Sequence, residues 1–165
     1  MQYLNRHFFQ LGFKESETAK IKTELVKNDG LSTAITGEST KADGSTQKYD
    51  GSYYPDFTCP DTLDKIYLLS LQEVTDSKYG FEYKEWGSDE KRDKEVTDYA
   101  IAMAPHEYER DEWYKREGHL WVLRSPCYED RNGVASCSKD RLTASSGVRS
   151  IADRISVVPA LTISE

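Results

Sequence analysis

The sequence predicts a single loop-rich α+β domain over residues 1–165. Residues 65–71 and 121–126 are short apolar runs of the kind typical of buried strands, and residues 158–163 supply a closing strand. The composition agrees with this class, because 11 Tyr and 3 Trp can anchor a core in a chain with only 37% hydrophobic residues. It suits a helical bundle less well.

The N-terminal segment is expected to be helical. Leu4, Phe8 and Leu11 recur close to helical spacing, which predicts a short amphipathic helix over the first dozen residues. Ser16 is the expected N-cap of a second helical turn at residues 17–20.

Little regular structure is expected between this helix and the first buried strand. Residues 21–26 alternate loosely, as a strand would, and the Asn-Asp-Gly sequence at 28–30 is a strong turn signal. Residues 29–62 are rich in Gly, Ser, Thr and Asp, so we expect a long polar loop with at most one hairpin.

The middle of the chain holds the clearest buried strand, at residues 65–71, followed by a short helical turn at 72–75. Residues 88–95 are almost wholly charged. We expect them to form a solvated helix face that Ser88 caps.

The C-terminal third is expected to contain the remaining core strands. Residues 121–126 form one, residues 133–138 and 142–145 form a hairpin, and residues 155–163 close the domain. Since alternate residues of neighbouring strands share a face, six side chains should be buried together: Ile66, Leu68, Trp121, Leu123, Ala160 and Leu161. Trp121→Ala should then lower the free energy of unfolding by roughly 3–5 kcal/mol in a denaturation experiment, and a solvent-exposed Trp121 would contradict the strand.

Charge and hydropathy exclude two classes of partner. A formal net charge of −7 is unfavourable for binding nucleic-acid phosphates, which attract Lys and Arg surfaces. No apolar run approaches the roughly 20 residues that a membrane-spanning helix needs, so we expect no membrane insertion. The first residues also lack the apolar core of a signal peptide.

The three cysteines leave two alternatives open. Cys127 and Cys137 flank an Asn-Gly pair, so a hairpin could bring them together as a disulfide in an oxidising compartment. Otherwise Cys59, Cys127 and Cys137 are free thiols that serve as small core residues.

Five ordered blocks of this chain resemble an uncharacterised bacterial domain family with the signature W-W-L-R-S-P followed by G-V-R-P-A-L. The blocks are YLNRHFF at 3–9, AKIKTELVKND at 19–29, DKIYLLSLQE at 64–73, WVLRSP at 121–126 and VPAL at 158–161. That family is similar to the C-type-lectin-like folds, in the branch that includes formylglycine-generating enzymes and variable receptor proteins of phages and retroelements. The resemblance implies a small twisted antiparallel sheet, two helices and long irregular loops. It also implies structural roles for Trp121, Arg124, Pro126 and Pro159.

This chain departs from the family pattern in three places. The pattern starts earlier, with a strand before the first helix, so we expect that strand to be missing or supplied by a partner chain. Ser156 and Val158 stand where the family has Gly and Arg, and Arg141 stands where a hairpin glycine is expected.

Arg124 is the residue whose chemistry is most specific. An arginine at the end of a buried strand can donate several hydrogen bonds from one planar group. We expect Arg124 to be largely buried and to bond main-chain oxygens or an acidic side chain of residues 127–157.

No catalytic or metal-binding constellation is recognisable. His7, His106 and His119 are dispersed, and the calcium motifs Glu-Pro-Asn, Gln-Pro-Asp and Trp-Asn-Asp of sugar-binding C-type lectins are absent. We therefore expect no cofactor and no tight binding of calcium or zinc. The enzyme alternative is a degenerate or unrecognised enzyme of the formylglycine-generating or sulfoxide-synthase type, with Cys127 and Cys137 as thiolate ligands of copper.

Aromatic residues in polar loops carry the functional hypothesis, because Tyr and Trp beside small polar residues are typical of antibody-like binding surfaces. The candidate binding residues are Tyr108, Trp113, Tyr114, Tyr128 and Arg131. We expect a non-enzymatic recognition or structural module that displays its loops to a protein or glycan partner on a bacterial or phage surface. The surface location rests on the family resemblance.

Overall fold

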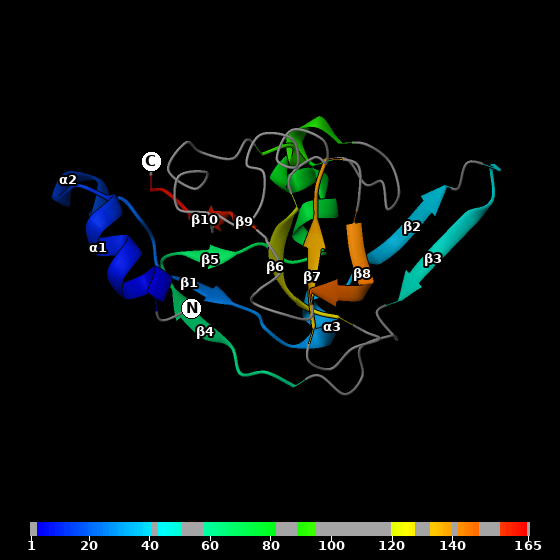
Figure 1. The fold of residues 1–165 in the computed structure, drawn as a ribbon, viewed down its shortest axis with the longest axis horizontal. Helices are drawn as coiled ribbons and strands as arrows, with labels where there is room; N and C mark the ends of the chain where they lie inside the picture. The colour runs from blue at the N-terminus through cyan, green and yellow to red at the C-terminus, as the bar shows by residue number, and fades with distance from the viewer. Residues whose placement is uncertain are drawn as a thin grey trace, which may run out of the picture.

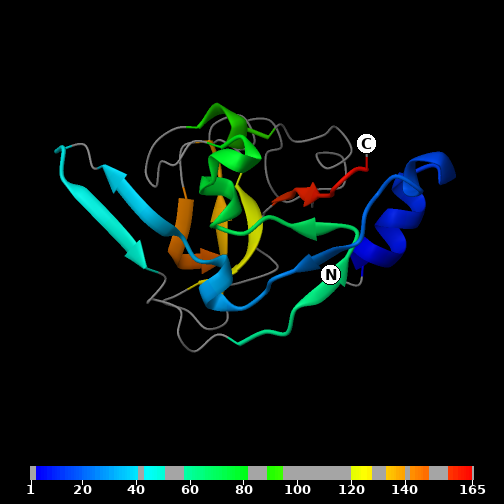
Figure 2. The same cartoon turned by 180° about the vertical axis from the view of Figure 1, so that it is seen from behind.

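The computed structural model describes residues 3–40, 43–50, 58–81, 89–94, 120–127, 133–139, 142–148 and 156–164. These residues form short helices and small, mostly antiparallel sheets, which confirms the predicted α+β class. Figures 1 and 2 show the N-terminal helices at one end, a β-hairpin at the opposite end and a four-stranded sheet between them.

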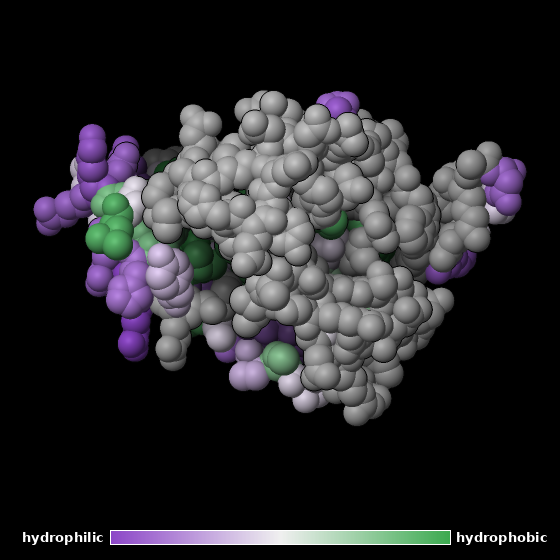
Figure 3. Space-filling model, viewed as in Figure 1, coloured by the Kyte–Doolittle hydropathy of each residue, from purple (hydrophilic) through white to green (hydrophobic). Residues whose placement is uncertain are grey.

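The N-terminal residues form a short helix, as predicted. A π-helical segment, η1 (Leu4–Phe8), continues directly into α1 (Phe9–Gly12). This end of the molecule is mixed in hydropathy, with hydrophilic side chains beside apolar ones in Figure 3, and Leu11 is 85% exposed. Among the described residues, no helix is long and apolar enough to cross a membrane.

The second helix, α2 (Glu15–Thr18), begins earlier than predicted. Its N-cap position is Lys14, whose N–H donates to the Glu17 carboxylate at 2.7 Å. The predicted cap at Ser16 is wrong, because the Glu17 side chain already supplies the acceptor at the start of the helix.

A two-stranded ribbon follows. β1 (Glu24–Val26) lies in the segment expected to favour a strand, and it pairs antiparallel with β4 (Thr62–Asp64). Leu25 and Leu63 are directly opposite each other in this register, and they are 56% and 72% exposed.

The Asn-Asp-Gly sequence begins a helix, where a turn was predicted. The Asp29 carboxylate accepts the N–H of Ser32 at 2.8 Å and caps α3 (Gly30–Thr33). The same side-chain-to-backbone bond defines an Asx turn and a helix N-cap, so the local sequence does not separate the two. In the described part of the polar segment that follows, β2 (Thr36–Thr40) and β3 (Thr46–Asp50) form a hairpin, which agrees with the expectation of at most one.

The predicted strand at 65–71 is mostly not a strand. Only β5 (Tyr67–Leu68) pairs, with β10 (Pro159–Ala160). Pairing stops because the next amides bond to side chains: the Ser70 N–H donates to the Glu73 carboxylate and the Leu71 N–H to the Ser125 hydroxyl, at 2.7 and 2.8 Å. The chain then forms η2 (Glu73–Thr75), which confirms the predicted helical turn, and η3 (Ser77–Tyr79).

The main sheet has the strand order β8-β7-β6-β9. β6 (Trp121–Pro126) pairs antiparallel with β7 (Val134–Cys137), which pairs antiparallel with β8 (Leu142–Val148). β9 (Ser156–Val157) runs parallel to β6. The predicted strand at 121–126 and the predicted hairpin after it are therefore confirmed.

The core packs around β6. Its buried members are Ala34, Leu71, Val74, Phe81, Trp121, Leu123, Ala135, Cys137 and Leu142. Of the six side chains predicted to be buried together, Trp121 and Leu123 lie in this cluster, and Ile66 is fully buried but is not a member of it. The prediction is wrong for Leu68, Ala160 and Leu161, which are half-buried, because β5 and β10 form a separate ladder and do not join β6.

The charged segment at 88–95 is not a solvated helix face in its described part, residues 89–94. It forms one 3₁₀ turn, η4 (Glu90–Arg92), in which Asp89 and Arg92 are 3% and 0% exposed. The Trp121 indole N–H donates to the Arg92 carbonyl at 3.1 Å. This turn therefore packs on the core strand, an arrangement that charge patterning alone does not reveal. Ser88 lies outside the described residues.

Cys59, Cys127 and Cys137 form no disulfide; Cys59 is exposed, and Cys127 and Cys137 are buried. The Cys127 N–H donates to the Gly133 carbonyl, whereas Cys137 pairs with Trp121 at the other end of β7. Four residues of strand separate the two ends, about 13 Å. That distance is too long for a disulfide or for a shared copper ion.

Candidate functional site

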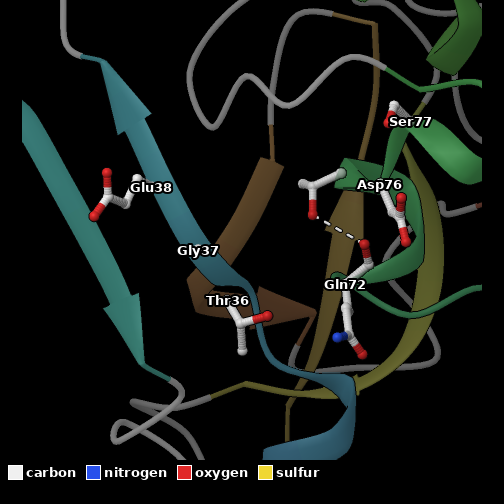
Figure 4. A pocket seen from close by; sticks show the side chains of 7 residues that line it. Thr36, Gly37, Glu38, Gln72, Asp76 and Ser77 are labelled. Carbon is white, nitrogen blue, oxygen red and sulfur yellow. Dashed lines mark hydrogen bonds between the residues drawn. The ribbon is translucent and has the colours of Figure 1, made fainter.

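A polar groove lies between the β2–β3 hairpin and the η2–η3 turn. It has a volume of about 330 Å³ and seven lining residues: Thr36, Gly37, Glu38, Gln72, Thr75, Asp76 and Ser77. We call it the β2 groove. Figure 4 shows that β2 forms one wall, and that β3 lies on the far side of β2 from the groove.

The base of the β2 groove is a fixed junction between its two walls. The Gln72 N–H donates to the Thr33 carbonyl at 3.2 Å, at the point where α3 ends and the chain turns into β2. Ala34 and Leu71, the neighbours of these two residues, are buried in the core. The walls therefore diverge from a point that the core holds in place.

The wall formed by the η2–η3 turn is held in place by hydrogen bonds within that segment. The Thr75 hydroxyl is buried and donates to the carbonyls of Leu71 and Gln72, at 2.9 and 3.0 Å, and the second bond is drawn in Figure 4. The Asp76 carboxylate accepts the N–H of Lys78 at 2.8 Å. These bonds position the Thr75 and Asp76 side chains before any ligand is bound.

The hairpin wall is more open. Thr36, Gly37 and Glu38 are exposed, and the Glu38 carboxylate pairs with the Lys48 ammonium across the ribbon at 3.1 Å. Gly37 has a φ of +106°, and no atom lies within 4 Å of the place where a Cβ would stand. A side chain at this position would be strained, so glycine keeps this part of the wall open.

The described lining of the groove is polar and carries two carboxylates. Its seven lining residues offer hydroxyl, amide, carboxylate and main-chain groups, and none of them is His, Cys, Lys or Arg. Among the described residues, no group of three or more His, Cys, Asp or Glu could hold a metal ion. The expectation that neither calcium nor zinc binds tightly stays a prediction, which calorimetric titration of the whole chain would check.

Arg124 lies elsewhere, on the side of β6 that faces β5. Its side chain is 9% exposed. Nε donates to the Lys27 carbonyl at 2.9 Å, Nη1 to the Leu68 carbonyl at 2.7 Å, and the Glu73 carboxylate bridges Nη1 and Nη2. The burial of Arg124 and its bonds to main-chain carbonyls agree with the sequence-based expectation.

The expected location of the partners of Arg124, residues 127–157, is wrong. The partners precede β6 in the chain, because alternation along the strand turns Arg124 away from the face of Trp121 and Leu123. That side of β6 meets the 68–70 segment, where the Arg124 N–H donates to the Leu69 carbonyl at 3.0 Å.

Other residues of the five sequence blocks also make structural hydrogen bonds. Asn5 donates to the Asp64 carboxylate and the Ile66 carbonyl, both at 2.8 Å, and accepts the N–H groups of Lys65 and Ile66. The Ser125 hydroxyl accepts from Leu71 and donates to the Thr33 carbonyl at 2.9 Å. The blocks thus connect segments that are distant in sequence.

A family model described as a domain of unknown function, DUF6273, matches residues 1–165. The chain belongs to the DUF6273 family. This confirms the resemblance to an uncharacterised domain family. No curated protein and no solved structure matches the chain.

In this DUF6273 domain the sequence candidates for binding stay a prediction. Tyr108, Trp113, Tyr114, Tyr128 and Arg131 lie outside the described residues. Trp121 is fully buried, and Pro126 and Pro159 are half-buried in β6 and β10.

Sequence reasoning missed the groove residues, which come from two segments more than thirty positions apart. Gly37, inside a polar strand, was the one available signal, since an isolated glycine in a strand often marks a close approach of other groups.

Proposed function

We propose that this DUF6273 domain is a non-enzymatic recognition module that binds a protein or glycan partner on a bacterial or phage surface. The observation that carries the proposal is the β2 groove, whose polar walls diverge from the Gln72–Thr33 junction. A wall of exposed polar groups beside a rigid turn is suited to hydrogen bonding with a partner, because little conformational freedom is lost there on binding.

A relationship to the C-type-lectin-like folds belongs to the same proposal. Its support is the resemblance of the five sequence blocks, together with a small sheet joined by long connections. An experimental structure of the whole chain, compared with that fold class, tests it.

The binding role is tested by screening the whole chain against a glycan array and a random peptide library. Each ligand found is titrated against Thr36→Trp, which places an indole in the groove, and against the matched control Thr23→Trp. Both threonines are exposed, so we expect unchanged melting temperatures. Binding should weaken at least tenfold in Thr36→Trp only.

Asp76→Asn removes a charge from the groove and keeps the acceptor for the Lys78 N–H. Asp93→Asn removes an exposed carboxylate that does not line it. A library without ligands, or ligands that bind all four variants alike, would contradict the proposal.

A further inference from the structure

We propose that the partner of the β2 groove is an extended peptide with a Lys or Arg side chain, which adds to the free edge of β2 as a third strand. This inference rests on the proposed function of the groove and names the class of its ligand. Four observations on the described residues support it.

The first is the free edge itself. Within the described residues β2 pairs only with β3, over five register pairs from Thr36–Asp50 to Thr40–Thr46. In an antiparallel pair, every second residue directs its N–H and C=O away from its partner strand. Figure 4 shows β3 on one side of β2 and the η2–η3 turn on the other, with β8 drawn between β2 and the turn, and residues of β2 and of the turn both line the groove. Unpaired edges of this kind are templates for added strands.

The second observation is the closed base of the groove. The bond from the Gln72 N–H to the Thr33 carbonyl joins the two walls, and beyond it β2 continues without a partner on the groove side among the described residues. The junction thus ends the groove at the start of β2, at Thr36. A peptide lying in the groove would run beside Thr36, Gly37 and Glu38.

The third observation is Gly37. It has no side chain, and the space around its missing Cβ is empty to 4 Å. A second backbone can therefore approach β2 closely at this position, which is a common reason for glycine within a strand.

The fourth observation is the character of the lining. Among the described lining residues there are two carboxylates, Glu38 and Asp76, and no basic side chain. Both side chains of the Glu38–Lys48 ion pair are exposed, so the pair is weak. A cation of the ligand can therefore compete for the Glu38 carboxylate. None of the seven lining residues is aromatic, which disfavours a sugar ring that needs an aromatic face. An extended peptide with a Lys or Arg side chain matches both the unpaired edge of β2 and the carboxylates of the groove.

The test uses the whole chain and the strongest-binding hexapeptide from a random displayed library. Hydrogen exchange is followed residue by residue along β2. In the free protein, alternate amides of Thr36–Thr40 should exchange rapidly, and the bound peptide should slow them at least tenfold. Methylating the peptide nitrogens one at a time should weaken binding at least tenfold at alternate positions only. Replacing its Lys or Arg by norleucine should weaken binding in the wild type and change little in Asp76→Asn.

Three outcomes would overturn the inference. Alternate β2 amides that are already protected in the free protein would mean that another segment of the chain occupies the edge. A glycan that binds wild type but not Thr36→Trp, without protecting β2, would overturn the peptide and leave the proposed function standing. If every ligand binds Thr36→Trp as tightly as the wild type, both this inference and the proposed function fail.

Discussion

At the residue scale, the side chains with the most specific contacts maintain the fold. Arg124 is the main example, because one guanidinium bonds two carbonyls and the Glu73 carboxylate from three separate segments. Its ring contact with Tyr67, 5.9 Å from the guanidinium carbon to the ring centre, adds a further partner.

Arg124→Lys should lower the free energy of unfolding by about 2 kcal/mol, because one ammonium cannot reproduce the planar set of donors. Urea denaturation of wild type and variant measures this. Arg6 is exposed, so Arg6→Lys is the matched control and should change the midpoint little. An unchanged midpoint in Arg124→Lys would show that its contacts contribute nothing to stability.

Cys137 gives the domain a pH dependence in alkaline solution. Burial raises the pKa of the Cys137 thiol, and the nearby charges of Arg92 and Lys94 offset only part of this. The folded chain therefore keeps the proton at pH values where the unfolded chain has released it. Below the ordinary thiol pKa of about 9, both states are protonated and stability does not depend on this group.

Above that pH, the free energy of unfolding should fall by up to about 1.4 kcal/mol per pH unit through Cys137. Denaturation at about pH 8 and about pH 10 should show a smaller loss in Cys137→Ala than in wild type. Cys59→Ala, at an exposed thiol, should follow wild type. Equal losses in all three proteins would contradict the assignment.

At the element scale, short segments are joined by side-chain hydrogen bonds more than by long strand ladders. Five strands have only two or three residues: β1, β4, β5, β9 and β10. Such short ladders are marginal by themselves. Asn5 illustrates the alternative, since its amide group bonds β4 and the start of β5 to the N-terminal helix.

Asn5→Ala should lower the free energy of unfolding by about 2–3 kcal/mol, because it leaves the Lys65 and Ile66 N–H groups and the Ile66 carbonyl without this partner. Gln10→Ala, at an exposed helix position, is the control and should be nearly neutral. Thermal unfolding followed by circular dichroism checks both. A neutral Asn5→Ala would show that water replaces the amide without cost.

At the scale of the whole molecule, the core and the β2 hairpin are separate in space. Among the side chains that the structure describes, the buried cluster contains residues of β6, β7 and β8, whereas Thr36, Gly37 and Glu38 of β2 are exposed. Figure 2 shows the hairpin extending away from the main sheet. The domain thus combines a packed centre with an open binding wall.

Native-state hydrogen exchange should reflect this division. We expect the hydrogen-bonded amides of β2 and β3 to exchange roughly 100-fold faster than those of β6 and β7, because few buried contacts oppose local opening of the hairpin. Equal protection would mean that the hairpin unfolds only with the core, and that its strands pack more tightly than a two-stranded ribbon should.

Sequence reasoning was most successful where hydrophobic pattern and burial coincide. The strand at 121–126 was predicted because apolar residues are bounded by polar ones, and the burial of Arg124 was expected from its position at the end of that strand. Sequence reasoning failed at 65–71, where side chains take the place of backbone hydrogen-bond partners. It also failed at 88–95, where the Arg92 carbonyl accepts the Trp121 indole N–H.

Five features could be predicted from residue pattern alone: the α+β class, the N-terminal helix, the strand at 121–126, the hairpin after it and membership of one domain family. These depend on local periodicity and on ordered motifs, which a sequence carries directly. The partners of Arg124, the burial of Arg92 and the existence of the β2 groove became known from the three-dimensional structure. Each of these depends on contacts between segments distant along the chain, and such contacts are set by packing and not by local pattern.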